Sequence, residues 1–99
     1  MISRVSGIKN SKRDEPPQEV LLSLSELIKQ GKFEETLNNA SSSLTRFPNS
    51  VSLHNIKGVA NKKLGLLNDS INDFQHALSL NPNFADAHYN IALTTSDLS

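Results

Sequence analysis

The stretch that decides the fold spans residues 50–83 and reads SVSLHNIKGVANKKLGLLNDSINDFQHALSLNPN. On both sides of Gly65, apolar residues recur at the three- and four-residue spacing of an amphipathic helix. Ser50 has the side chain of a helix N-cap, and Pro82 cannot continue a helix. The stretch therefore predicts two amphipathic helices joined by a tight turn.

The same pattern occurs again with a period of about 34 residues. Upstream, the matching pairs are Gly31 with Gly65, Phe33 with Leu67, Leu37 with Ile71, Leu44 with Leu78, and Pro48-Asn49 with Pro82-Asn83. Downstream, His54, Asn55 and Gly58 correspond to His88, Tyr89 and Ala92. A fixed period of this length, made of helix pairs, predicts an all-α fold, an α-solenoid of antiparallel helix pairs with about five helices.

The expected helices follow from start and stop signals along the chain. They cover residues 18–30, 33–46, 51–64, 68–80 and 85–97. Gly31 is expected to end the first in the left-handed conformation. Gly58, in the middle of the third, costs about 1 kcal/mol relative to alanine. We therefore expect a neighbouring helix to approach closely at Gly58.

Two finer expectations concern the fourth and fifth helices. Asn68 or Asp69 is expected to cap the fourth helix, which places an acid near its positive end. The fifth helix is expected to pack backward on the fourth through Ala87, Ile91, Ala92 and Leu98.

The chain divides into two parts on composition. Residues 1–16 have no apolar periodicity and predict a flexible lead-in, and residues 17–99 form the repeat region. Within that region the repeats cover about 17–50 and 51–84, and 85–99 supplies one further first helix. This last helix is apolar for a terminal one, so either the solenoid continues beyond it or its face pairs with another chain.

Composition excludes several classes of function. Ten basic residues balance ten acidic ones, which argues against a nucleic-acid binder. The chain has no cysteine, so thiolate nucleophiles, disulfides and zinc ribbons are excluded. It has no apolar run long enough to span a bilayer and no secretory signal, so we expect no membrane partner and a cytoplasmic location.

The residues of the two later repeats resemble the tetratricopeptide repeat family. The middle unit carries the small, aromatic and proline positions of that family; these are Gly58, Gly65, Phe74, Ala77 and Pro82. The third unit, ADAHYNIAL, matches at Ala87, Tyr89, Asn90, Ile91 and Ala92. The first unit departs from the pattern, with Leu24 at the glycine position and Ala40 at the aromatic position. The resemblance implies a right-handed superhelix of about two and a half repeats.

No constellation of residues predicts catalysis, a cofactor or a metal site. His54, His76 and His88 are spread over three expected helices, and two of them recur at the repeat period, which favours a structural role. No serine lies in a nucleophile-elbow sequence, and no glycine-rich loop suits a phosphate. We therefore expect a protein that is not an enzyme.

The resemblance implies that the first helices of successive repeats line a concave groove that binds partner segments. The expected groove residues are Leu21, Ser25, Ile28, Lys29, Asn55, Val59, Lys62, Lys63, Asp86, Tyr89, Asn90 and Leu93. Some family members grip acidic chaperone tails with a lysine and asparagine clamp, but here Leu21, Ile56 and Asp86 stand at clamp positions. A neutral or mixed-polarity segment is the expected ligand.

The resulting hypothesis is a protein-interaction module that binds a peptide segment or a protein, as an adaptor or scaffold. Two alternatives stay open. The chain is the N-terminal substrate-docking scaffold of a larger transferase-type enzyme, as implied by the family, or it forms a homo-oligomer through the fifth helix.

Overall fold

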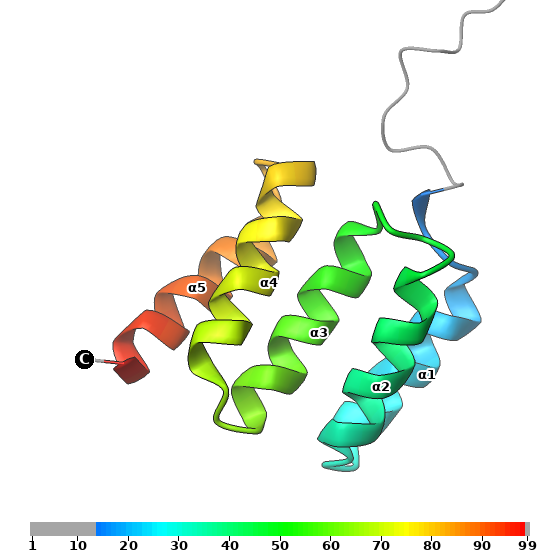
Figure 1. The fold of residues 1–99 in the computed structure, drawn as a ribbon, viewed down its shortest axis with the longest axis horizontal. Coiled ribbons are helices and arrows are strands. Elements are labelled where there is room, and N and C mark those ends of the chain that lie inside the picture. The colour runs from blue at the N-terminus through cyan, green and yellow to red at the C-terminus, as the bar shows by residue number, and fades with distance from the viewer. Residues whose placement is uncertain (1–13, 99) are drawn as a thin grey trace, which may run out of the picture.

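The computed structural model describes residues 14–98, and within that range the chain forms five α-helices. They are α1 (Gln18–Lys29), α2 (Phe33–Leu44), α3 (Val51–Lys63), α4 (Leu67–Leu80) and α5 (Ala85–Leu98). Consecutive helices run antiparallel along a molecule that measures 52 × 26 × 18 Å (Figure 1). The predicted all-α fold of stacked helix pairs is confirmed.

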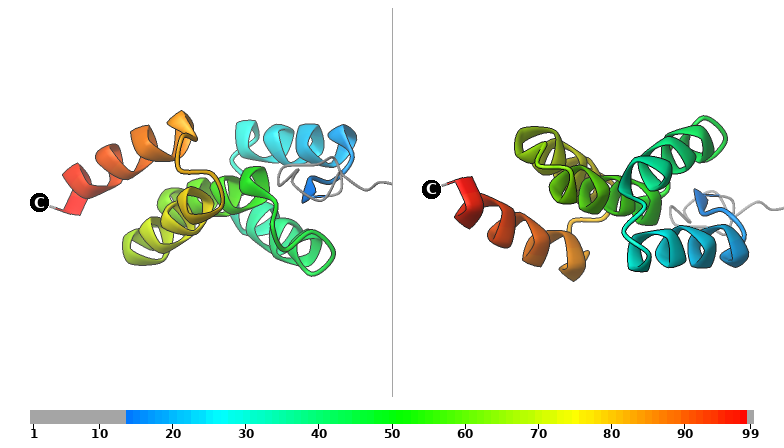
Figure 2. Two further views of the ribbon diagram at one scale, coloured as in Figure 1. Left: turned by 90° about the horizontal axis from the view of Figure 1, so that it is seen from above. Right: turned by 90° about the horizontal axis from the view of Figure 1, so that it is seen from below.

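The five helices form two rows (Figure 2). The first helix of each unit, α1, α3 or α5, lies in one row, and α2 and α4 lie in the other. α3 contacts all four other helices, so it is the centre of the molecule. The predicted lead-in of residues 1–16 lies almost wholly outside the described residues, and the division of the chain at residue 17 stays a prediction.

The same turn closes both helix pairs. Gly31 and Gly65 have positive φ angles of 76° and 84°, as expected for a left-handed residue after a helix end. After α1, the Lys32 N–H donates to the Leu27 carbonyl at 2.9 Å, and after α3 the Leu66 N–H donates to the Asn61 carbonyl at 2.9 Å. These bonds satisfy carbonyls that the helix ends leave unpaired.

This turn explains why the predicted cap of α4 is wrong. α4 begins at Leu67, its N-cap is Leu66, and no side chain caps it. Leu66 both completes the turn after α3 and begins α4, so no residue is left over for a capping side chain. Asp69 lies in the first turn of α4 instead, near the positive end of the helix dipole.

The core consists of two clusters, one for each helix pair. Leu24, Ala40 and Leu53 form the first, and Val51, Phe74, Ala77 and Ala87 form the second. The expected close approach at Gly58 is confirmed, because a Cβ atom at that position would lie 2.5 Å from the Phe74 ring. The missing side chain of Gly58 therefore makes room for the fully buried Phe74.

The expected packing of α5 is confirmed in part. Ala87 is buried and Ile91 packs against the second cluster, but Ala92 is exposed and Leu98 is 47% exposed. Thr94 is buried in their place, and its hydroxyl donates to the Asn90 carbonyl at 2.7 Å. The expectation for Ala92 and Leu98 is wrong because α4 covers only one side of α5.

The ordered contacts extend to residues before α1. The Ser50 hydroxyl donates to a carboxylate oxygen of Glu15 at 2.6 Å, and the Ser52 N–H donates to the other at 3.4 Å. Ser50 also caps α3 as predicted, since its Oγ accepts from the Leu53 N–H at 3.0 Å. α3 has no acidic residue in its own first turn, so Glu15 supplies the negative charge that favours a helix N-terminus.

Candidate binding face

The expected groove residues lie on the row formed by α1, α3 and α5, on the side away from α2 and α4 (Figure 2). Two of them, Leu21 and Val59, pack against the core clusters and are half-buried. The exposed members are Ser25, Lys29, Lys63, Asp86, Tyr89 and Leu93, and the remaining half-buried members are Ile28, Asn55, Lys62 and Asn90. The face thus has an apolar base with a polar and aromatic surface.

Two of the expected residues from different repeats meet directly. The Asn90 Nδ2 donates to the Asn55 Oδ1 at 3.1 Å, which joins α5 to α3. This bond leaves the Asn55 amide group as a donor and the Asn90 carbonyl oxygen as an acceptor. A donor and an acceptor held side by side match the N–H and C=O of an extended peptide backbone.

The charges predicted on this face are paired in part. The Lys62 Nζ lies 3.8 Å from the Asp97 carboxylate, so the basic centre of the face and its acidic end form an ion pair across α3 and α5. Lys63 and Asp86 are exposed at either side. The α1 residues Ser25 and Lys29 lie at the opposite end of the row from α5 (Figure 1).

Tyr89 is the most exposed large apolar side chain among the described residues, at 66%, and Leu93 on the same helix is 39% exposed. The two residues are four positions apart and therefore lie on one side of α5. An exposed tyrosine gives a large and rigid contact area to a binding partner.

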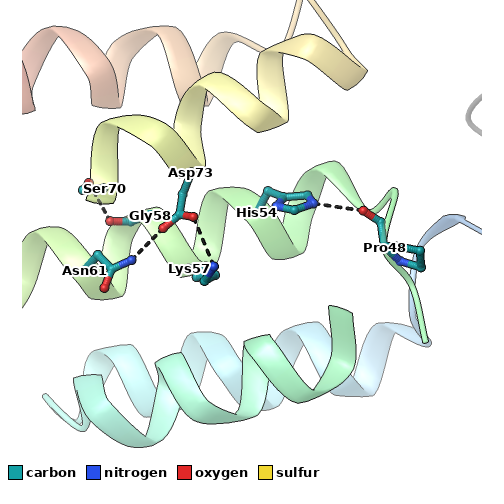
Figure 3. A network of polar contacts seen from close by, with 7 residues as sticks. All are labelled: Pro48, His54, Lys57, Gly58, Asn61, Ser70 and Asp73. Atoms are coloured by element: carbon teal, nitrogen blue, oxygen red, sulfur yellow. Dashed lines mark hydrogen bonds and ion pairs between the residues drawn. The ribbon is translucent and has the colours of Figure 1, made fainter. Parts of the chain in front are cut away.

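A polar network between α3 and α4 was not predicted (Figure 3). The Asp73 carboxylate accepts from the Asn61 Nδ2 at 2.6 Å and pairs with the Lys57 Nζ at 3.3 Å. The Ser70 hydroxyl donates to the Gly58 carbonyl at 2.7 Å. Next to this network, a 410 Å³ cavity opens between α2 and α4, lined by Leu37, Asn38, Ser41, Lys57, Asn61, Leu66, Asp69, Asn72 and Asp73.

His54 and His76, which the sequence seemed to scatter, stack with ring centroids 3.9 Å apart. The His54 Nε2 donates to the Pro48 carbonyl at 3.0 Å, and His88 makes the same bond to the Pro82 carbonyl at 2.8 Å one repeat later. The predicted structural role of the two periodic histidines is thereby explained, because each ties a first helix to the loop before it.

Burial lowers the pKa of His54 below the ordinary value of 6.5, and the neighbouring His76 acts in the same direction. The hydrogen bond to the Pro48 carbonyl opposes the shift. The Nδ1 of His54 is buried, and within residues 14–98 it has no hydrogen-bond partner. A second proton on this ring would therefore be buried without an acceptor.

One signal in the sequence points to these unpredicted contacts. Helices that run antiparallel from a turn at Gly65 bring together positions equally far from it. His54 and His76 are each eleven residues from Gly65, and Lys57 and Asp73 are each eight residues from it. Residues 14–98 contain no group of three histidine, cysteine or acidic side chains arranged to hold a metal ion. Over the same range, no helix has the length and apolar character needed to cross a membrane.

The two-row arrangement of antiparallel helix pairs, repeated every 34 residues, defines the class of helical-repeat proteins. Residues 58–97 match the family model described as TPR repeat. The chain is therefore a member of the tetratricopeptide repeat family, whose repeats typically form non-catalytic modules for protein–protein interaction. Among curated proteins, none matches the sequence.

Proposed function

We propose that the face formed by α1, α3 and α5 binds an extended segment of a partner protein, and that the chain acts as an adaptor or scaffold without catalytic activity of its own. The observation that carries this proposal is the Asn90–Asn55 hydrogen bond of 3.1 Å, with the exposed Tyr89 beside it. The bond fixes one donor and one acceptor in place before a ligand arrives, which lowers the entropy cost of binding.

The charges of the face define the kind of segment that it accepts. Lys62 is paired with Asp97, and the exposed Lys63 and Asp86 have opposite signs. Neither a strongly acidic nor a strongly basic segment finds a uniform counter-charge there. The ligand is therefore a neutral or mixed-polarity segment that places its backbone on the two asparagines and an apolar side chain against Tyr89 and Leu93. A contact of this limited size has an affinity of roughly micromolar strength.

The test compares two variants of matched exposure. The first carries Lys63→Glu and Tyr89→Ala on the proposed face, and the second carries Leu22→Ala and Asn72→Ala on other sides of the molecule. All four side chains are exposed, so both variants are expected to fold. Proteins captured from a cell lysate by the wild type are identified by mass spectrometry, and overlapping peptides of each are titrated against the wild type and both variants.

We expect one peptide to bind the wild type and the Leu22/Asn72 variant equally, and the Lys63/Tyr89 variant at least about tenfold more weakly, since hot-spot residues carry most of a binding energy. Equal binding of every peptide to the Lys63/Tyr89 variant would overturn the proposal. Loss of binding in the Leu22/Asn72 variant alone would move the binding site to the cavity between α2 and α4.

A further inference from the structure

One side of α5 has no covering helix among the described residues. The same side of α1 is covered by α2, and that of α3 is covered by α4. The α3 positions that meet α4 there are His54, Lys57, Gly58 and Asn61. One period later, the corresponding positions of α5 are His88, Ile91, Ala92 and Thr95. We call these four residues, with Leu98, the open face of α5.

The open face is accessible and uncharged. His88, Ala92 and Thr95 are exposed, Leu98 is 47% exposed, and only Ile91 is half-buried against the core. At the corresponding α3 positions, Lys57 pairs with Asp73 of α4. Because Ile91 replaces this lysine, an acidic residue that covered α5 would be left without a partner. The open face therefore favours a covering helix that has no charge at the contact.

The size of Ala92 limits the covering helix further. A Cβ at Gly58 would lie 2.5 Å from the Phe74 ring, so Ala92 cannot accept an aromatic side chain placed as Phe74 is. A helix like α4, with an acid next to a phenylalanine, is the wrong match for α5. The open face needs a helix with small or medium uncharged side chains at its centre, and α5 itself presents such side chains.

We propose that two copies of this chain pack through the open faces of their α5 helices, antiparallel and around a two-fold axis. An axis that passes between Ala92 and Thr95 sets the Ala92 of each copy against the partner subunit's Thr95 and brings Leu98 near the partner subunit's His88. The contact is self-complementary, as a two-fold interface must be, and places no like charges together. α5 lies at one end of the molecule, so a second copy can approach it without meeting α1 or α2 (Figure 2).

The dimer leaves the proposed peptide-binding face accessible. Tyr89 and Leu93 lie on another side of α5 from Ala92 and Thr95, and Asn90 is bonded to α3. The inference therefore stands apart from the proposed function, and either can fail alone. A single helix pair buries less area than a stable protein interface, so the dimer is weak, with a dissociation constant that is micromolar or higher.

Sedimentation equilibrium of the full chain, from low to high micromolar concentration, tests the proposal. We expect the wild type to pass from monomer to dimer as its concentration rises. Ala92→Glu places like charges across the axis and is expected to weaken the dimer at least about tenfold. Leu22→Glu is the matched control, since Leu22 is 60% exposed on α1 at the far end of the molecule, and we expect it to dimerise like the wild type.

A chemical crosslink gives a second measurement that does not depend on the glutamate variants. The chain has no cysteine, so Ala92→Cys adds a single thiol, as does the control Leu22→Cys. A short bismaleimide is expected to join two copies at residue 92 and not at residue 22. A wild type that stays monomeric at high micromolar concentration would overturn the proposal. A dimer that Ala92→Glu leaves intact, or equal crosslinking at both positions, would overturn it as well.

Discussion

The two complete helix pairs fill the same position in opposite ways. In the second pair, Gly58 of α3 makes room for Phe74 of α4, and in the first pair Leu24 of α1 lies in one core cluster with Ala40 of α2. Each pair therefore combines one large and one small residue, but the large residue has changed helix. The departure of the first repeat from the family pattern is a compensated exchange of size, and its core is closed by the same total of apolar side chains.

The polar side of the two pairs differs as well. Lys57, Asp73 and the stacked His54 and His76 fill the contact between α3 and α4. At the corresponding positions, α1 and α2 carry smaller uncharged residues, and a 270 Å³ cavity opens between them, lined by Glu19, Val20, Ser23, Leu24, Asn39 and Ser43. One pair is therefore held by a buried polar network that the other lacks. The following predictions test this difference.

The largest effect is expected from Gly58→Leu. Since even a Cβ at this position would collide with the Phe74 ring, the variant is expected to lose about 3 kcal/mol or more of unfolding free energy, at or above the upper end for an overpacked core. Urea unfolding followed by circular dichroism measures the loss. Ala92→Leu is the control at the corresponding exposed position of α5 and should change stability little.

A second change separates overpacking from a general loss of helix. Adding Phe74→Ala to Gly58→Leu recreates the size order of the first pair, with the large residue on the first helix. Part of the lost stability is then expected to return. If the double variant is as unstable as the sum of its single variants, the idea of an exchange in size is wrong.

A medium effect is expected from Asp73→Ala, which removes the acceptor of both Lys57 and the buried Asn61. Leaving a buried donor without a partner costs about 1–3 kcal/mol. Asn39→Ala changes the corresponding exposed residue of the first pair and should stay within about 0.5 kcal/mol of the wild type. Similar losses in both variants would show that the network does not distinguish the two pairs.

The smallest effect concerns pH. Because the pKa of His54 is lowered in the folded chain, the unfolded chain binds more protons below the ordinary value of 6.5, and stability falls as the pH drops through that range. His54→Gln should reduce this acid sensitivity, as measured by unfolding at neutral and at mildly acidic pH. His88→Gln changes the exposed histidine of the same loop contact and should keep the sensitivity.

The sequence was enough to predict the repeat, the two turn glycines, the Ser50 cap and the close approach at Gly58, because each depends on spacing or on local backbone geometry. It was not enough for the start of α4, where the turn after α3 takes the place of a cap. The packing of Ala92 and Leu98 was predicted wrongly for a related reason: an apolar residue on a helix shows that the face favours a partner, not that one is present.

The candidate binding face was predicted less completely. The family pattern placed Asn55 and Asn90 on one face, but their mutual hydrogen bond depends on how far α5 approaches α3, which no local pattern encodes. The polar network of Asp73 was missed because paired positions were compared between repeats and not across the turn within one repeat. Contacts between residues far apart in the sequence are where spacing arguments end.

The contact between Glu15 and Ser50 has a consequence for the way in which the chain folds. Helical repeats usually gain stability from near neighbours in the sequence, so their ends can unravel one unit at a time. The Glu15 contact spans 35 residues and closes a loop around the entire first helix pair. Since the start of α3 receives its charge from beyond α1, unravelling of the first pair also weakens the second. The two pairs therefore open together as one cooperative unit.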